Sequence, residues 1–251
     1  MNAAPHGPQP LADRRTLLRG AGGLLVTLLA PGVTLYAFGA QEQAAEGKAS
    51  SKVRWALLID IGKCPTGCDL CVAACREENG WRETGRPEID AQWIRKVKLR
   101  DARTGELREV PVMCQHCDKP ACVDVCPTGA SFKRADGIVL VDKHICIGCR
   151  FCMMACPYKA RSFVHEPLTD QKPWAPRGKG TVEGCTLCVH RLDSARLPAC
   201  VEACAAKAGG AMLFGDLNDP NSDIAKAIAA YASSQIRPDL GLEPAVRYRN
   251  L

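Results

Sequence analysis

Sixteen cysteines gathered in four runs constrain this 251-residue chain more than any other feature. The two central runs lie between positions 114 and 156. One contains Cys114, Cys117, Cys122 and Cys126, and the other reads Cys146-Ile-Gly-Cys149-Arg-Phe-Cys152-Met-Met-Ala-Cys156-Pro157. With only 5% aromatic residues and many glycines and prolines, the chain is expected to wrap around inorganic centres rather than one large hydrocarbon core.

The spacing of the last central run is C-x2-C-x2-C-x3-C-P, which in bacterial ferredoxins binds [4Fe–4S] clusters. Three thiolates from a short loop hold three corners of one cube, and the fourth ligand comes from the other motif. The proline after the last cysteine removes an N–H and stops a helix. The central runs therefore predict two clusters with exchanged ligands: Cys114, Cys117, Cys122 and Cys156 for one, and Cys146, Cys149, Cys152 and Cys126 for the other.

Two outer runs extend the same logic. They are Cys64-Pro-Thr-Gly-Cys68-Asp-Leu-Cys71-Val-Ala-Ala-Cys75 and Cys185-Thr-Leu-Cys188, followed after eleven residues by Cys200 and Cys204. Exchange of the fourth ligand predicts one cluster on Cys64, Cys68, Cys71 and Cys204, and another on Cys185, Cys188, Cys200 and Cys75. All sixteen cysteines are then used, and four [4Fe–4S] clusters are expected.

Other interpretations of the cysteines explain their spacing less well. The three-residue first gap after Cys64 also occurs in radical-SAM triads, but the chain lacks the alternating strands and helices of such enzymes, and the extra residue leaves the loop geometry at Cys64 open. Disulfides are allowed in an exported protein, and zinc favours paired C-x2-C knuckles. Neither needs triplets with a remote fourth cysteine. His116 is expected to be a loop residue packed near a cluster, and Met153 and Met154 are expected to shield one.

The N-terminus predicts export. Arg14 and Arg15 precede an uncharged, mostly apolar run from 20 to 40, and twin arginines before such a run mark a Tat signal. Tat carries folded proteins, which suits a cargo that receives its clusters in the cytoplasm. We expect residues 1–40 to be this signal segment and the protein to work at the periplasmic side of the cytoplasmic membrane. An uncleaved N-terminal anchor is the alternative, since the run approaches the ~20 residues that span a bilayer.

The rest of the chain predicts an α+β fold of two ferredoxin-like modules, each with two clusters, short strands, small helices and many loops. A linker (41–52) leads to an outer module (53–100 with 181–215), an inner module (101–180) and a C-terminal helix and tail (216–251). Strands are expected at 53–60, 93–100, 107–112 and 138–141, with a turn at 101–106 between the second and third. Residues 166–180 read as an exposed loop, and a helix is expected from Ile224 to about Gln235.

The formal charge of +6 does not indicate nucleic-acid binding. An oxidised [4Fe–4S] cube with four thiolates carries a charge of about −2, so four clusters add about −8. Because every cluster has a full set of thiolates, no open iron is expected, and the chain is predicted to be an electron-transfer subunit and not an enzyme. A chemically distinct iron seen by spectroscopy would favour catalysis instead.

The four runs, in this order and with this eleven-residue insertion, resemble the four-cluster ferredoxin subunits of membrane-bound respiratory complexes, such as the dimethyl sulfoxide, polysulfide and tetrathionate reductases. The resemblance covers residue 54 to the C-terminus. Within that family the central motifs resemble the DsrO branch, exported ferredoxin subunits of the DsrMKJOP complex of dissimilatory sulfur metabolism. It implies an electron relay between an NrfD-like, quinone-interacting membrane subunit near the inner module and a multihaem cytochrome c or other redox subunit. A molybdopterin reductase subunit is the alternative partner.

Overall fold

The computed structural model describes residues 25–30, 33–37 and 49–251. The chain divides into two units between residues 46 and 47. In the first, strands β1 (Leu25–Ala30) and β2 (Val33–Ala37) pair antiparallel. The twin arginines lie outside the described residues. Within the part that the structure describes, the helices are all too short or too polar to cross a membrane.

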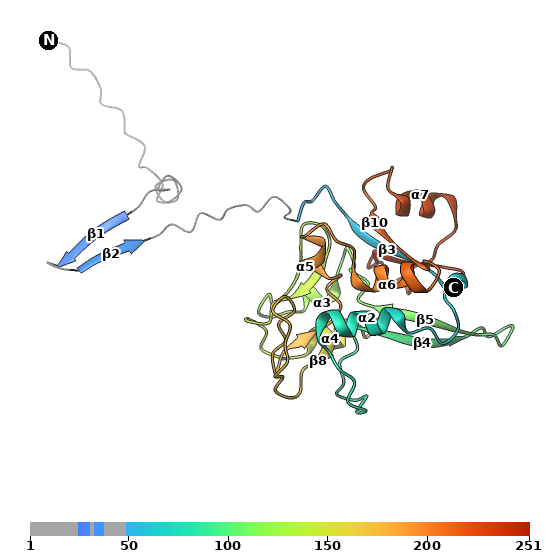
Figure 1. The fold of residues 1–251 in the computed structure, drawn as a ribbon, viewed down its shortest axis with the longest axis horizontal. Helices are drawn as coiled ribbons and strands as arrows, with labels where there is room; N and C mark the ends of the chain where they lie inside the picture. Colours follow the sequence, from blue (N-terminus) through green and yellow to red (C-terminus); the bar gives the residue numbers. More distant parts are fainter. Residues whose placement is uncertain (1–24, 31–32, 38–48) are drawn as a thin grey trace, which may run out of the picture. The chain divides into compact units, whose positions relative to one another are not determined.

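A three-stranded sheet contains the first and the last strand of the second unit. Its central strand β3 (Trp55–Asp60) pairs antiparallel with β10 (Met212–Asp216) and parallel with β11 (Val246–Arg249); β3 and β10 are labelled in Figure 1. Strand β3 is apolar on both faces because both are covered. Leu57 and Ile59 face a core that contains several cysteines, and Ala56 and Leu58 face a second core with Ile224 of helix α7.

Helix α7 spans Asp223–Ala230 and ends five residues before the predicted end. It begins where predicted, because the Ser222 side chain accepts a hydrogen bond from the Ala225 N–H at 3.2 Å. It stops because the next residues pair with β11. Ser234 exchanges two backbone hydrogen bonds with Tyr248, at 2.7 and 2.8 Å. The sequence did not predict β10 or β11, and the C-terminal tail supplies one edge of the sheet.

The predicted hairpin is confirmed. Strands β4 (Ile94–Arg100) and β5 (Leu107–Met113) pair antiparallel, with Arg100 opposite Leu107. The turn is held by Asp101, whose carboxylate accepts from the N–H groups of Arg103 and Thr104 at 2.7 and 3.1 Å. Strand β5 leads directly into Cys114, so the hairpin positions the first cysteine of the central runs.

Two pairs of helices carry most of the buried cysteines. Helix α2 (Leu70–Asn79) packs on α6 (Ala199–Lys207), and the shorter α3 (Ala121–Asp124) packs on α4 (Phe151–Ala155). Figure 1 shows α2 and α6 beneath the sheet. The remaining elements are short: η1 (Ile61–Lys63), β6 (Ser131–Lys133) paired with β7 (Val139–Val141), β8 (Ser162–Phe163) paired with β9 (Val182–Glu183), α5 (Val189–Leu192) and η2 (Pro238–Leu240). Such short strands and helices joined by loops confirm the predicted α+β class.

The segment 166–180 is irregular, as predicted, but it is not exposed throughout. Arg177 is 8% exposed and forms a two-point ion pair with the fully buried Glu183, at 2.8 and 2.7 Å. The Arg177 guanidinium also donates to the Gly80 carbonyl at the end of α2 at 3.1 Å. The end of this loop therefore packs into the protein, where it contacts the end of α2 and Glu183.

Candidate iron–sulfur sites

The cysteines meet in four places, which we number along the molecule. Site 1 comprises Cys64, Cys68, Cys71 and Cys204; site 2 comprises Cys75, Cys185, Cys188 and Cys200; site 3 comprises Cys114, Cys117, Cys122 and Cys156; site 4 comprises Cys126, Cys146, Cys149 and Cys152. These are the four sets that ligand exchange predicts. Two of them surround small pockets: the four cysteines of site 2 line one and the four of site 4 line the other.

In the other two sets, the cysteines are close enough for their thiolates to repel one another. Cys71 is close enough to Cys64, Cys204 and Cys68 for each of them to raise its pKa. Cys114 and Cys117 each have Cys122 and Cys156 as such neighbours. The structure thus brings together every member of each predicted set. Their role as iron ligands stays a prediction.

Helix geometry explains how adjacent sites share an element. In α2, Cys71 and Cys75 lie four residues apart on one face, and the first belongs to site 1 while the second belongs to site 2. In α6, Cys200 and Cys204 repeat the arrangement in reverse order. Because α2 and α6 pack together, the two helices present one cysteine each to both sites.

The donor set fits a cluster better than a single ion or a disulfide. All sixteen cysteines are free thiols. Among the residues that the structure describes, no three Cys, His, Asp or Glu side chains lie close enough to hold one metal ion. A zinc ion would draw its ligands to about 2.3 Å from one point, whereas a cube separates its thiolates by its own width. The four-cysteine sites thus fit a polynuclear centre better than a single ion, as predicted for [4Fe–4S] clusters.

Burial favours the protonated form of several of these thiols. Loss of solvent raises the pKa of Cys71 to about 11 and those of Cys75 and Cys114 to about 12. A coordinated metal removes the proton from a thiol outright. At these three buried cysteines, cluster insertion itself would therefore generate the thiolate.

Hydrogen-bond donors already point at several sulfurs. The backbone N–H groups of Ser131, Val182 and Leu187 donate to Cys126, Cys146 and Cys185, at 3.3, 3.5 and 3.4 Å. Such donors stabilise the added negative charge of a reduced cluster and tune its potential. The loops around the sites thus contribute to the electronic properties of the clusters as well as to their attachment.

Three polar side chains add to these donors, and the sequence did not single them out. Arg161 donates to Cys122 Sγ at 3.1 Å, and Asn79 lies 3.6 Å from Cys75 Sγ and 4.0 Å from Cys188 Sγ. Lys96 Nζ lies 3.5 Å from Cys64 Sγ. In the sequence, each of them is only a charged or amide residue a few positions from a cysteine, or on a strand that leads to one. That pattern is too common to predict a contact with sulfur.

His116, Met153 and Met154 have different surroundings. His116 is fully buried, with a pKa lowered to about 3 by desolvation, and its Nδ1 accepts the Val139 N–H at 3.1 Å. It therefore braces the loop of site 3, as expected of a packed loop residue. Met153 packs against the core around Cys152, but Met154 is 66% exposed. The expected shielding applies to Met153 and is wrong for Met154.

The four sites form a row. Cys71 of site 1 is close to Cys200 of site 2, and Cys185 of site 2 is close to Cys114 of site 3. Cys152 of site 4 is in turn close to Cys122 of site 3. Each neighbouring pair of sites is thus linked through its own ligands, which makes a continuous relay from site 1 to site 4 chemically feasible.

The two ends of the row have different surfaces. At site 4, Cys149 is exposed, and three apolar residues within five positions of it in the sequence are exposed too: Ile147 is 66% exposed, Phe151 50% and Met154 66%. We call Ile147, Phe151 and Met154 the site 4 rim. At site 1, Cys64 lines an open recess of about 460 Å³ together with polar groups that include Glu106, Arg108 and Asn250.

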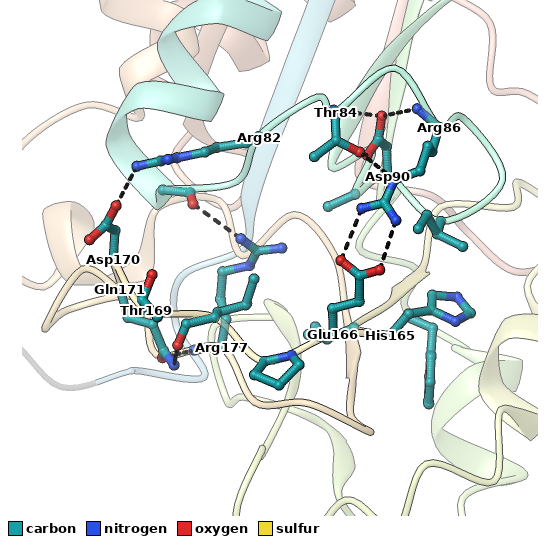
Figure 2. A pocket seen from close by; sticks show the side chains of 17 residues that line it. Arg82, Thr84, Arg86, Asp90, His165, Glu166, Thr169, Asp170, Gln171 and Arg177 are labelled. Atoms are coloured by element: carbon teal, nitrogen blue, oxygen red, sulfur yellow. Dashed lines mark hydrogen bonds and ion pairs between the residues drawn. The ribbon is translucent and has the colours of Figure 1, made fainter.

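A further pocket of about 170 Å³ lies between residues 80–91 and 163–171, away from the cysteines (Figure 2). Ion pairs cross it: Arg82 to Asp170 at 2.7 Å, and Arg86 to Glu166 through two hydrogen bonds at 2.7 and 2.9 Å. The described residues that line it include no cysteine. These ion pairs hold the two loops together, so the pocket is the place where the loops pack against each other.

Comparison with known proteins agrees with this geometry. Two models described as 4Fe-4S dicluster domains match residues 106–217 and 63–130. The Hdr-like menaquinol oxidoreductase iron-sulfur subunit 1 of Archaeoglobus fulgidus is 43% identical over 227 residues, covering 80% of this chain and 84% of the relative. A tetrathionate reductase subunit of Salmonella typhimurium is 39% identical, covering 81% and 75%. Protein NrfC of Escherichia coli K12 is 38% identical, covering 76% and 78%.

These relatives span most of the chain, and two of them are named as subunits of reductases or quinol oxidoreductases. The two dicluster matches together cover all sixteen cysteines, and no relative among these is named as a catalytic subunit. The chain belongs to the family of iron–sulfur subunits that carry four [4Fe–4S] clusters and transfer electrons within membrane-associated oxidoreductase complexes.

Proposed function

We propose that this chain relays electrons between a quinone-interacting, NrfD-like membrane subunit at site 4 and a second redox subunit at site 1. The observation that carries the proposal is the site 4 rim. A terminal cluster whose ligand Cys149 is exposed among apolar side chains is suited to a partner that buries this surface, because exposed apolar clusters of this kind commonly mark interfaces. A relative named as a menaquinol oxidoreductase subunit supports the quinone side.

At the other end, the open recess beside Cys64 is polar and carries both signs of charge. Such a surface suits a partner that docks through polar contacts, and a multihaem cytochrome c is the partner we propose. This arrangement corresponds to the DsrO-like subunits of dissimilatory sulfur metabolism. We propose in addition that a Tat signal in residues 1–40 directs the protein to the periplasmic side of the membrane, with retention of the segment as an anchor as the alternative.

A second candidate is the iron–sulfur subunit of a molybdopterin reductase, such as a tetrathionate or polysulfide reductase. The relatives named as a tetrathionate reductase subunit and as a dimethyl sulfoxide reductase iron-sulfur subunit favour it. The relay of four clusters is the same in both cases. The difference lies in the protein that meets site 1.

Mass spectrometry of proteins that copurify from gently solubilised membranes decides between the two. An NrfD-like membrane protein with a multihaem cytochrome supports the first proposal, and a large molybdopterin protein supports the second. Recovery of the chain alone contradicts both. The N-terminal peptide in the same experiment reports whether the signal segment has been removed.

Variants of the rim then test where the membrane partner docks. Phe151→Glu places a charge on the site 4 rim and is expected to abolish copurification of the membrane partner. Leu240→Glu, at an exposed apolar position in η2 that is 40% exposed, is the matched control and should leave the complex intact. An intact complex in the Phe151 variant would contradict the placement of the partner.

A further inference from the structure

Arg161 is a buried cation in contact with a cysteine of site 3. It follows Cys156 by five residues and is 9% exposed. Its Nη2 donates to Cys122 Sγ at 3.1 Å and to the Ser131 hydroxyl at 2.8 Å. The guanidinium is thus fixed against a ligand of site 3 on one side and against strand β6 on the other.

No carboxylate in the described part of the chain lies within ion-pair distance of Arg161, and its Nη1 has no hydrogen-bond partner there. Arg177, which is equally buried at 8%, shows the usual solution, because Glu183 binds it through two oxygens. An unpaired charge in a protein interior costs several kcal/mol. Arg161 must therefore find its negative partner in something other than a side-chain carboxylate.

The thiolates around it supply that partner. Cys122 and Cys114 of site 3 and Cys152 of site 4 are the groups whose negative charges act on Arg161. A [4Fe–4S] cluster with four thiolates carries about −2 when oxidised and about −3 when reduced. A cation held between two such clusters stabilises each of them more strongly in the reduced state, since the attraction grows with the added electron.

We propose that Arg161 is the shared counter-ion of sites 3 and 4 and makes both clusters easier to reduce. The inference rests on the proposed ligand sets of these two sites. The outer sites lack an equivalent in the described part of the chain. At site 2 the corresponding donor is the neutral amide of Asn79, and at site 1 the charge of Lys96 is shared with Glu109 at 3.8 Å. Arg161 thus sets an energy difference along the row, with electrons favoured on the inner pair.

The test is an EPR-monitored redox titration of the purified, cluster-filled protein. Arg161→Gln removes the charge and keeps a hydrogen-bond donor, and Arg161→Lys keeps the charge. We expect Arg161→Gln to weaken electron binding at two of the four clusters by at least tenfold, which is about 59 mV for a one-electron couple. The other two potentials should stay in place as an internal reference, and Arg161→Lys should stay close to the unmodified protein.

Arg95→Gln is the matched control. Arg95 donates to the carbonyls of Tyr158 and Lys159 in the same loop, but it donates to none of the described cysteine sulfurs. All four potentials should be unchanged in this variant. An equal shift in Arg95→Gln would show that general surface charge accounts for the effect and would overturn the assignment to Arg161.

Iron content and the number of EPR-active clusters are measured on every variant. Unchanged potentials in a fully loaded Arg161→Gln protein refute the proposal. Loss of two clusters in Arg161→Gln but not in Arg161→Lys supports it, because the charge is then required. Loss in both variants would assign Arg161 to packing alone and refute it. None of these measurements needs a partner protein, so a failure of the proposed membrane docking is distinguishable from a failure here.

Discussion

Replacing Glu183 by glutamine should destabilise the protein by about 3–5 kcal/mol, the usual cost of removing one partner from a buried ion pair. Glu183 is fully buried, and Arg177 donates to both of its oxygens at 2.8 and 2.7 Å. Glutamine has nearly the same shape, so no cavity forms. The loss is electrostatic: the Arg177 guanidinium stays buried without a compensating charge.

This loss of stability is large relative to the total free energy of unfolding of a domain. Domains are typically stable by about 5–15 kcal/mol, so the variant would lose about a fifth or more of its stability. With a denaturant slope of about 3 kcal/mol/M in urea, the unfolding midpoint falls by roughly 1–2 M. Because Glu183 lies between the Cys146 and Cys185 loops, the visible absorption of the clusters should bleach in the same transition.

Two further variants separate electrostatics from shape. The double replacement Arg177→Met with Glu183→Leu should recover most of the lost stability, since apolar groups of similar volume often replace a buried ion pair without cost. Glu166→Gln breaks the equally two-pronged pair with Arg86 at the surface (Figure 2), where both side chains are about half exposed, and should have little effect.

A Glu183→Gln protein with the midpoint of the unmodified chain would refute this reasoning. So would a double variant that is no more stable than the single one, because the deficit would then come from lost packing and not from an uncompensated charge.

Further predictions concern the sites themselves. Cys149→Ser should lose or convert one inner cluster and block quinone-linked electron flow; unchanged iron content and turnover would contradict the ligand pairing. Gly148→Ala should lower cluster loading at site 4, as counted by iron analysis, because its φ is +69° and an added Cβ would stand 2.1 Å from a backbone oxygen. Lys96→Met should lower one outer potential, since the positive charge beside Cys64 favours the reduced cluster. Glu109→Gln should raise the same potential by freeing Lys96 from its partner, and a titration in which both variants shift it in the same direction would contradict this.

The cysteine spacing predicted much of the grouping at the sites because most members of each set lie close together in the sequence. A run such as Cys146-Ile-Gly-Cys149-Arg-Phe-Cys152 contains its own loop geometry, and exchange of the fourth ligand follows from the direction in which the chain leaves. The β4–β5 hairpin was equally readable, because Asp101 and Gly105 determine its turn within a few residues.

Features that depend on contacts between distant parts of the chain could not be predicted from the sequence. Strand β11 exists because β3 offers it an edge, and α7 stops at Ala230 because Ser234 bonds to Tyr248. Neither signal lies in the local sequence. Arg161 was missed for the same reason: five residues beyond Cys156 it looks like any charged residue after a motif, and only its contact with Cys122 and its lack of a carboxylate distinguish it.

The position of β11 in the sheet determines how late in synthesis the sheet can be completed. Its parallel pairing with β3 joins the first strand of the second unit to the last, and Asn250 donates to Asp60 across 190 positions. At roughly 5–20 residues per second, that interval takes a ribosome roughly 10–40 s. During this time β3 has an unpaired edge, and Cys64, Cys68 and Cys71 await Cys204. The outer pair of clusters can therefore be closed only once Cys204 has been made, late in synthesis, whereas the inner pair, complete at Cys156, can be filled earlier on the growing chain.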